Sequence, residues 1–341
     1  MKGFVLAAGL GTRLKPITDS IPKPLVPVGN VPLVGYALKL LSHYGITEVI
    51  VNTHHLMDEL KSALGTGEQF GVSITYSDEE EILGTGGGLK KMNHLLEDDT
   101  FVVVNSDTLI NVDLKRVIDF HRQHGGLATM VLREHPKEDA FGGIEIDAAG
   151  RIRRILGQGS DEEDLRSLMF TGVHIFEPRF LEYIPPDVET CINRYGYMKA
   201  LNNDEKLYGF VCDGYWADAG TPQRYFNANV DALEESMNLG HIDPLQGYAL
   251  APKKSGVEVV RMGENVELGN NVRLLPPVVL GDGARIGDDA VVGPYCVVGD
   301  KVQIGRESQV SHSVVLDGTR IEPGERFSKM ILSKKQRLPV E

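Results

Sequence analysis

The stretch FVLAAGLGTRLKPITDSIPKP, residues 4–24, decides how this 341-residue chain begins to fold. Its first four residues are an apolar run that predicts a strand, and this strand leads into a turn that contains Gly9 and Gly11. Glycines let the backbone turn sharply and bring its N–H groups close to an anion. The turn is followed by cationic side chains at Arg13, Lys15 and Lys23. The stretch therefore predicts a strand that ends in a phosphate-binding turn.

Two common glycine-rich templates do not fit this turn. A dinucleotide-binding turn needs a third glycine at position 14, for close packing of the following helix, and this chain has Leu14 there. A P-loop ends in Gly-Lys-Ser or Gly-Lys-Thr, which is missing as well. The phosphate-binding turn is therefore of another kind.

Apolar runs alternate with helical patterns up to about residue 130, which predicts an α/β fold with a doubly wound, mixed but mainly parallel sheet. Strands are predicted over residues 4–7, 48–52, 72–76, 101–104 and 127–132. Helices are predicted over residues 34–44 and 113–124, each ended by a glycine. In such sheets ligands bind beyond the carboxyl ends of the strands. Both the glycine turn and Asn105-Ser106-Asp107 fall at this edge.

Residues 140–220 have a more antiparallel pattern. A hairpin is predicted from 144–147 and 152–155, a further strand over 171–176, and a helix over 222–237. We assign residues 1–240 to one domain and 241–252, a mixture of Gly, Pro and polar residues, to a linker.

Beyond the linker, the sequence repeats every six residues. One apolar series comprises Val266, Val272, Val278, Ala284, Ala290, Cys296 and Val302. A second series lies two residues later, from Leu268 to Ile304, and glycines follow most of its members. This period is typical of a left-handed parallel β-helix, which we predict over residues 253–328 with about three coils. Residues 329–341 are predicted to form a surface tail.

Composition excludes several classes of function. The net charge of −13 disfavours nucleic-acid binding, and the N-terminal apolar run is too short for a signal peptide or a membrane span, so we expect a cytoplasmic protein without membrane partners. The three cysteines, Cys191, Cys212 and Cys296, lack metal-binding spacing and are predicted to be buried thiols. Exposed coil faces of a β-helix predict a homo-oligomer.

Two separated aspartates could hold a metal ion. Asp107 directly follows an apolar strand, and Asp218 lies in Tyr215-Trp216-Ala217-Asp218-Ala219-Gly220-Thr221. Mg²⁺ prefers one or two carboxylates together with phosphate oxygens and water. Singly, each aspartate could equally form a turn or cap a helix.

The motifs together resemble those of the sugar-1-phosphate nucleotidyltransferases, the pyrophosphorylases that make nucleotide sugars. The matching segments are L-A-A-G-x-G-T-R-L-x-P-x-T from Leu6, P-K-P at residues 22–24, N-S-D at 105–107 and W-x-D-x-G-T from Trp216. The resemblance implies Mg²⁺ held by Asp107 and Asp218, with Arg13, Lys23 and Asp107 as catalytic residues. It also implies nucleotide contacts from Leu6, Ala8, Gly9, Gly11, Thr12, Arg13 and Lys23.

A third block, Glu79 to Leu89, is similar to the base-binding loop of the guanylyl- and uridylyl-transferring branches, which implies base contacts from Gly84, Thr85 and Gly86. With the hexapeptide repeats, the chain looks most like the mannose-1-phosphate guanylyltransferases, which implies GTP and a sugar-1-phosphate as substrates. Uridylyl or thymidylyl transfer to a glucose, heptose or muramic-type sugar phosphate is the first alternative. A nucleotide-sugar-binding regulator and a hexapeptide acyltransferase with His312 as base are the others.

The family's sugar site is matched only in part. Gly142, Thr171 and Gly172 match positions that line the sugar pocket. Many members carry a lysine in E-K-P that binds the sugar phosphate, but residues 155–159 here read Ile-Leu-Gly-Gln-Gly. Arg153 or Arg154 could replace it. His54, His55, His121 and His124 are predicted to be surface or capping residues rather than metal ligands.

Overall fold

The computed structural model describes residues 1–134, 143–250 and 260–341. By its contacts the chain divides into two compact units. The first comprises Met1–Leu10, Pro22–Pro24 and Val34–Trp216, and the second comprises Gly11–Ile21, Leu25–Leu33 and Ala217–Glu341. This division does not coincide with the boundaries at 240 and 253 that the sequence predicts.

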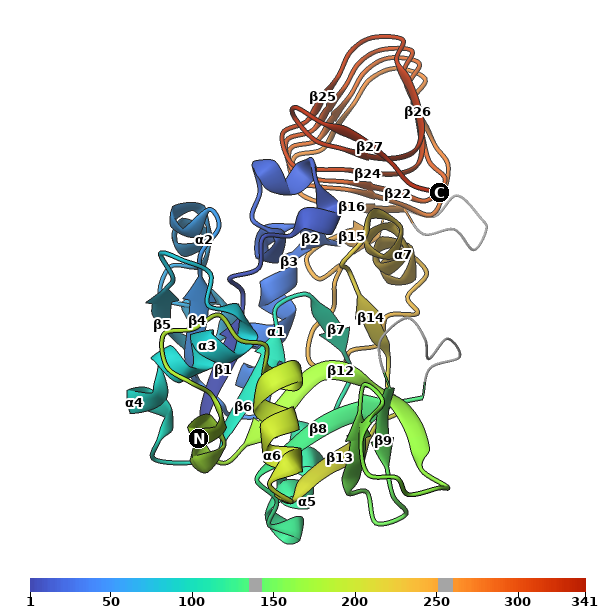
Figure 1. Cartoon of the computed structure of the whole chain (residues 1–341). Coiled ribbons are helices and arrows are strands. Elements are labelled where there is room, and N and C mark those ends of the chain that lie inside the picture. Colours follow the sequence, from blue (N-terminus) through green and yellow to red (C-terminus); the bar gives the residue numbers. More distant parts are fainter. Residues whose placement is uncertain (135–142, 251–259) are drawn as a thin grey trace. The chain divides into compact units, whose positions relative to one another are not determined.

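The first unit is built on a mixed sheet (Figure 1), in the strand order β11-β10-β9-β12-β6-β1-β4-β5. In addition, β8 pairs with β12, and β13 pairs with β8. The strands are β1 (Lys2–Leu6), β4 (Glu48–Thr53), β5 (Ser73–Asp78), β6 (Phe101–Asn105), β8 (Ala128–Arg133), β9 (Gly143–Ile146), β10 (Ile152–Ile155), β11 (Gln158–Gly159), β12 (Arg166–Phe176) and β13 (Leu207–Val211). Short strands β7 (Thr108–Ile110) and β14 (Trp216–Asp218) lie outside this sheet. The predicted α/β fold is therefore confirmed.

The centre of the sheet is parallel. β1 pairs in parallel with β4 and β6, and β4 pairs in parallel with β5. β12 is antiparallel to β6, β8 and β9, and the hairpin partners β9 and β10 are antiparallel too. The carboxyl ends of β1 and β6 consequently meet at one edge, as the sequence predicts: Ser106 N donates a hydrogen bond to Leu6 O.

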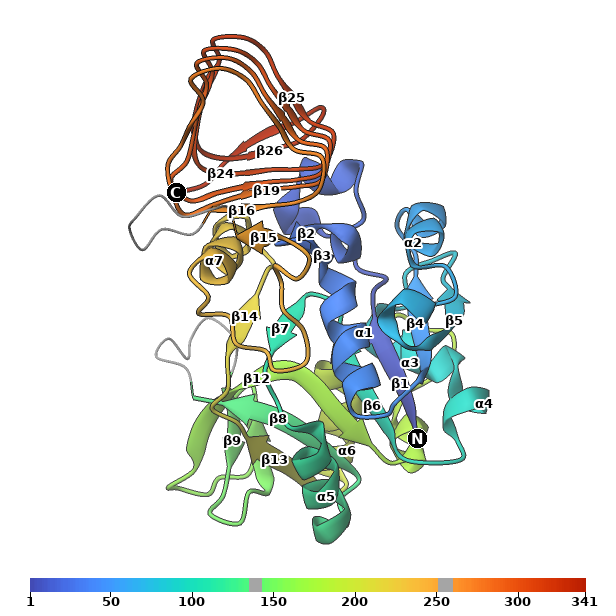
Figure 2. The same cartoon turned by 180° about the vertical axis from the view of Figure 1, so that it is seen from behind.

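Helices cover both faces of this sheet. They are α1 (Leu33–His43), α2 (Met57–Leu64), α3 (Gly84–Lys91), α4 (Asn93–Leu96), α5 (Leu114–His124) and α6 (Met198–Asn202), with a π-helix over Ile192–Tyr197. Figure 1 places α3 and α6 in front of the strands, and Figure 2, from behind, places α1 and α5 there. A Cβ on Gly3 of β1 would lie 2.8 Å from a Leu41 methyl group, so α1 packs tightly against the sheet. In the described residues, no helix is both long and apolar enough to cross a bilayer.

The ends of the predicted helices follow their capping residues. The Asp113 side chain accepts a hydrogen bond from Arg116 N at the start of α5. Gly125, in the left-handed conformation at a φ of 57°, ends the same helix. One expectation on this helix is wrong, because His121 is 1% exposed rather than on the surface. Its ring nitrogens contact Thr129 Oγ1 and Glu177 Oε1, which lets the imidazole be buried.

A second buried histidine lies inside the sheet of the first unit. His174 of β12 stacks between Phe170 and Phe176, with ring centroids 4.2 and 5.0 Å away, and its Nδ1 lies 2.9 Å from the Tyr197 hydroxyl. Burial lowers the pKa of His174 to about 3, because the charged ring would lose its hydration.

We expect His174 to make stability depend on pH. Its pKa is lower in the folded chain than the ordinary 6.5, so the unfolded state binds the extra proton as pH falls below 6.5. The free energy of unfolding should therefore fall by about 1.4 kcal/mol per pH unit between pH 6 and pH 3 from this group. His174→Gln cannot take up this proton. Urea denaturation at pH 7.5, 6 and 5 should show that the difference in the free energy of unfolding between wild type and variant becomes smaller as the pH falls. A difference that stays constant over these pH values would contradict a lowered pKa for His174.

The second unit consists mainly of short strands. They are β2 (Pro27–Val28), β3 (Val31–Pro32), β15 (Ala249–Leu250), β16 (Val260–Met262), β17 (Glu267–Leu268), β18 (Arg273–Leu274), β19 (Val278–Leu280), β20 (Arg285–Ile286), β21 (Val291–Val292), β22 (Cys296–Val298), β23 (Gln303–Ile304), β24 (Gln309–Val315), β25 (Arg320–Ile321), β26 (Arg326–Leu332) and β27 (Arg337–Pro339). One helix, α7 (Pro222–Leu233), precedes the strands that begin at β15.

The strands from β16 to β26 stack in parallel and trace triangular coils in Figure 1, which fits the predicted β-helix. β16, β19, β22, β24 and β26 form one face, and β17, β20, β23 and β25 form another. The hexapeptide series points into the coil: Val278, Ala284, Ala290, Cys296 and Val302 are each 0% exposed.

A glycine followed directly by an aspartate recurs at one corner of successive coils, at residues 281–282 and 299–300. Asp282 Oδ1 accepts a hydrogen bond from the backbone N of Glu264, which lies 18 residues earlier, and Asp300 Oδ1 accepts from Asp282 N in the same way. A Cβ on Gly281 would lie 2.5 Å from Asp300 Oδ1. The period of the sequence thus reflects close contact between one coil and the next.

The C-terminal tail differs from its prediction. β26 continues the stack to Leu332, which is 0% exposed, instead of ending at residue 328. β27 then pairs antiparallel with β26, and Val340 is 6% exposed. Apolar residues at these positions carry the segment onto the coil, and its lysines stay at the surface.

Candidate active site

The phosphate turn, residues 7–13, begins where β1 ends. Ala7 N donates a hydrogen bond of 2.7 Å to Asn52 Oδ1 on the neighbouring β4. Gly11 has a φ of 62°, a conformation that favours glycine, and a short 3-10 helix over Thr12–Leu14 follows it. Thr18 Oγ1 donates to Gly11 O and fixes the end of the turn. No described atom lies within 4 Å of the place a Cβ on Gly9 would take, so a ligand can approach this backbone closely.

Two of the predicted catalytic residues are in direct contact. Lys23 Nζ forms a close ion pair with Asp107 Oδ2, although the two lie 84 residues apart in the sequence. Their side chains are 12% and 25% exposed, so the pair is partly shielded but accessible. Because both groups lie at the carboxyl edge of the sheet, a phosphate that binds there meets a lysine and a carboxylate together.

Asp218 lies between two arginines of the second unit. Arg224 Nη1 is 3.0 Å from Asp218 Oδ2. A Cβ on Gly220 would lie 2.5 Å from Asp218 Oδ1 and 2.6 Å from Arg13 Nη2, so only glycine leaves room between these side chains. Sequence reasoning missed Arg224. The one feature of the sequence that could have indicated it is its position three residues after Thr221. The Thr221 hydroxyl accepts a hydrogen bond from Arg224 N and caps α7.

The Asp218 carboxylate suits a divalent cation. Its Oδ1 is buried and, within the described part of the chain, accepts no hydrogen bond. A buried carboxylate oxygen normally has a partner, and hard oxygen ligands of this kind are those that Mg²⁺ takes. Asp107 belongs to the first unit and Asp218 to the second.

The predicted base-binding glycines lie inside a helix rather than in a loop. α3 starts at Gly84, and Gly86 N donates a hydrogen bond to Thr190 O. Thr85 Oγ1 accepts one from Ile192 N. A Cβ on Gly84 would lie 2.5 Å from Thr190 O. Glycine is therefore required here by the approach of the chain's own residues 188–192, and the Gly86 N–H is already bonded; base contacts from this segment stay a prediction.

The predicted sugar-binding residues lie on an irregular part of β12. Thr171 Oγ1 donates to Val131 O, and Thr171 O accepts from Trp216 Nε1 at 2.8 Å. Gly172 has a φ of 100°, and a Cβ there would overlap the Thr108 side chain. Gly142 lies outside the described residues.

Both arginines that could replace the family's lysine are ion-paired with a carboxylate. Arg153 Nε lies 2.8 Å from Asp147 Oδ2, and Arg154 Nη1 lies 2.5 Å from Glu145 Oε2. Another cation lies beside β12, because Arg133 is paired opposite Met169, two residues before Thr171. Arg133, at the end of β8, lies over the Trp216 ring at 5.9 Å, and in the described part of the chain its hydrogen bonds go to backbone carbonyl oxygens.

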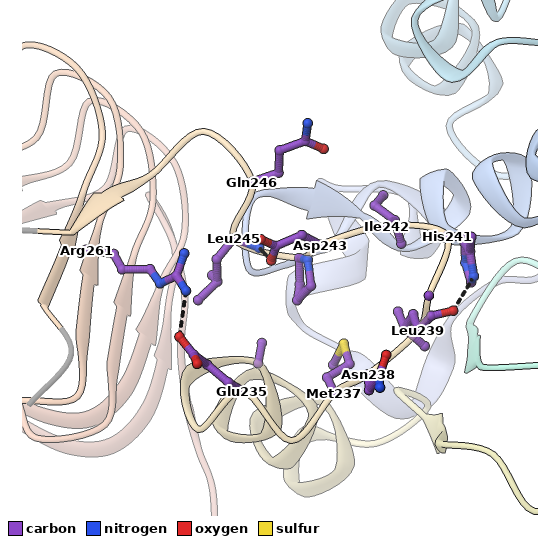
Figure 3. A pocket seen from close by; sticks show the side chains of 13 residues that line it. Glu235, Met237, Asn238, Leu239, His241, Ile242, Asp243, Leu245, Gln246 and Arg261 are labelled. Carbon is purple, nitrogen blue, oxygen red and sulfur yellow. Dashed lines mark hydrogen bonds and ion pairs between the residues drawn. The ribbon is translucent and has the colours of Figure 1, made fainter. Parts of the chain in front are cut away.

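The second unit also contains a hollow of about 750 Å³ beside the end of α7. Residues 237–246 line it, together with Glu235 and Arg261. Figure 3 shows Arg261 pointing at Glu235, to which it is ion-paired at 2.6 Å. Among the described residues, none of the predicted site residues lines this hollow.

The comparison with known families agrees with this geometry. A family model described as "Nucleotidyl transferase" matches residues 2–235, more than half of the chain. The chain belongs to this family. A second model, described as the GMPPB C-terminal domain, matches residues 274–339 of this nucleotidyltransferase.

Its relatives act on sugar phosphates, by their names. UTP–glucose-1-phosphate uridylyltransferase from Synechocystis is 34% identical over 78% of this chain and 72% of that protein. Mannose-1-phosphate guanylyltransferase from Mycobacterium tuberculosis is 33% identical over 67% of this chain, which spans 64% of that relative's length. The nucleotidyltransferase is thus a member of the sugar-1-phosphate branch of the family.

Solved structures give the same fold. A putative glucose-1-phosphate thymidylyltransferase from Bacillus anthracis is similar with a TM-score of 0.60 and 28% identity, covering 67% of this chain and 94% of that one. HddC from Yersinia pseudotuberculosis has a TM-score of 0.57 at 24% identity, covering 67% of this chain and 98% of that one, which is a likeness of fold.

Proposed function

We propose that this nucleotidyltransferase joins a nucleoside triphosphate to a sugar-1-phosphate and releases pyrophosphate, with GTP and mannose-1-phosphate as its preferred pair. The observation that carries the reaction is the pairing of each predicted carboxylate with cations: Asp107 with Lys23, and Asp218 with Arg224 beside Arg13. The choice of GTP and mannose is supported by the match of residues 274–339 to the GMPPB C-terminal domain and by the guanylyltransferases among the relatives.

The reaction requires no covalent intermediate with the protein. An oxygen of the sugar phosphate attacks the α-phosphorus, a new P–O bond forms, the bond to the β-phosphate oxygen breaks, and pyrophosphate leaves with the electron pair. Both substrates are anions, so the protein must align them and neutralise their repulsion. Arg13 and Lys23 hold the pyrophosphate portion, and the phosphate turn offers its N–H groups. Mg²⁺, when held by Asp107 and Asp218, supplies charge neutralisation at the α-phosphate.

Arg133 provides the cation for the sugar phosphate. Arg153 and Arg154 are neutralised by carboxylates. Arg133 is paired opposite Met169, two residues before Thr171, and within the described residues its hydrogen bonds go to backbone carbonyl oxygens. We expect Arg133→Met to raise the KM for the sugar-1-phosphate about 10-fold, the worth of one charge-assisted contact, and to leave the KM for the triphosphate within twofold. Arg153→Met is the matched control. A larger effect from Arg153→Met would reverse the assignment.

Pyrophosphate release tests the proposed function. The assay crosses GTP, UTP, dTTP, CTP and ATP with mannose-, glucose-, heptose- and amino-sugar-1-phosphates in the presence of Mg²⁺. We expect the highest kcat/KM for GTP with mannose-1-phosphate, and loss of activity in Asp107→Asn. A different best pair would identify another substrate branch. If no pair released pyrophosphate while the protein still bound a nucleotide sugar, the alternative of a nucleotide-sugar-binding regulator would be favoured.

The proposal also includes the expected location, oligomeric state and partners of the protein. We expect a cytoplasmic homo-oligomer that binds neither nucleic acid nor membrane. Light scattering of the full chain would contradict the oligomer if it gave the mass of one chain.

A further inference from the structure

A buried carboxylate connects two parts of the nucleotide site in the first unit. Glu79 directly follows β5 and is 1% exposed. Its Oε2 accepts a hydrogen bond of 2.9 Å from Leu83 N, the residue before α3 begins. Its Oε1 accepts a hydrogen bond of 2.7 Å from Asn52 Nδ2. Glu79 therefore fixes the start of the glycine-rich helix to the neighbouring strand β4.

Asn52 carries the connection on to the phosphate turn. It is 2% exposed, and its Oδ1 accepts the 2.7 Å hydrogen bond from Ala7 N. The backbone N–H of Ala7 can only donate, so Asn52 must turn its oxygen to Ala7, which leaves its NH₂ group to donate to Glu79. A continuous chain of hydrogen bonds thus runs from Leu83 through Glu79 and Asn52 to Ala7.

This Glu79–Asn52 bridge is enclosed by the helix that it positions. A Cβ on Gly88 of α3 would lie 2.7 Å from Glu79 Oε1 and 2.9 Å from Asn52 Nδ2. Glycine is therefore required for α3 to lie directly against the two side chains. Burying a carboxylate is costly unless its oxygens are hydrogen-bonded, and both oxygens are bonded here.

We propose that Glu79 and Asn52 are positioning residues that hold the base-binding segment and the phosphate turn in one fixed geometry, so that a nucleoside triphosphate meets both at once. This inference rests on the proposed function for the identity of the ligand. Neither side chain contacts the nucleotide; each acts through the backbone that it holds, at Leu83 and at Ala7. The bridge lowers the cost of ordering the site when the nucleotide binds.

Variants that exchange the carboxylate at position 79 and the amide at position 52 separate the positioning role from an effect on the stability of the fold. Glu79→Gln places an NH₂ group against either Asn52 Nδ2 or Leu83 N, and Asn52→Asp places two carboxylates together. Each single variant should weaken nucleotide binding about 10-fold or more, because one buried hydrogen bond is lost and a donor or charge is left opposed. The KM for the sugar-1-phosphate should stay within twofold.

The double variant Glu79→Gln, Asn52→Asp restores every hydrogen bond with the charge moved by one side chain. The new carboxylate at position 52 would accept from Ala7 N and from the NH₂ group of the new amide at position 79. The oxygen of that amide would accept from Leu83 N. We expect nucleotide binding within threefold of wild type. Asp78→Asn is the matched control, because the Asp78 side chain bonds Thr53 across the same two strands and is not part of the chain of hydrogen bonds from Leu83 to Ala7.

The experiment measures binding of GTP with Mg²⁺ by calorimetry without sugar phosphate, alongside steady-state KM values and thermal unfolding of each variant. Recovery in the double variant supports the bridge. The bridge is overturned if the single variants bind GTP as wild type does, if both substrates weaken in step with stability, or if the double variant does not recover. Wild type that binds GTP yet releases no pyrophosphate would overturn the proposed function instead, and the binding measurements would still decide the bridge.

Discussion

Asp218→Asn is expected to lower kcat about 1,000-fold while the KM for the triphosphate changes little. The variant keeps the shape of the side chain but removes its charge. Asp218 Oδ1 is the buried oxygen without a hydrogen-bond partner in the described residues, and therefore the one open to a cation. Its Oδ2 also forms the ion pair with Arg224, which is lost when the charge is removed.

The measurement is pyrophosphate release at saturating substrates over a Mg²⁺ titration, with thermal unfolding to verify the fold. Asp204→Asn is the control, since it also removes a carboxylate from an arginine, at the 2.6 Å pair with Arg151, but at a side chain that is 91% exposed. It should retain wild-type activity. A kcat for Asp218→Asn within tenfold of wild type would remove Asp218 from the proposed metal site.

Lys23→Met should reduce kcat/KM for the triphosphate by about 100- to 1,000-fold. The lysine is 12% exposed and forms the close ion pair with Asp107, so its loss removes a phosphate-binding charge and leaves a partly shielded carboxylate without that cation. Repulsion between this carboxylate and the triphosphate adds to the loss. Both kcat and KM should therefore change.

Lys61→Met is the matched control for this variant. Lys61 is also ion-paired with an aspartate, Asp78, and is 29% exposed, but no predicted site residue is its partner in that pair. Its kcat/KM should stay within twofold of wild type. Equal losses in the two lysine variants would indicate that Lys23 acts through stability alone, and the proposed phosphate contact would be wrong.

The sequence predicts a role for some of the cations beside the two aspartates and not for others. Arg13 and Lys23 lie in the glycine-rich stretch, which predicts phosphate contacts by its composition. Arg224 lies on α7, where an exposed arginine is ordinary, and only the fold brings it to Asp218. Cys191, the residue before the π-helix, is exposed and not buried as predicted.

Local pattern determined a large part of this protein by itself. The alternation of apolar runs predicts β1, β4, β5, β6 and β8 to within two residues at their ends, and Gly45 and Gly125 predict where two helices end. The six-residue period predicts the inward side chains of the coils. These features are encoded by neighbours in the sequence, because strand pleat, helix turn and coil repeat each have a fixed spacing.

Only the tertiary structure decided which distant groups meet. The glycines of α3 are required by a segment whose Ile192 N bonds Thr85 Oγ1 across 107 residues, and the sequence pattern alone predicted a loop against a base. The burial of His121 depends on Thr129 and Glu177, and the Glu79–Asn52 bridge joins three neighbouring strands of the sheet. Hydrogen-bond partners of this kind have no fixed spacing along the chain, so no local period records them.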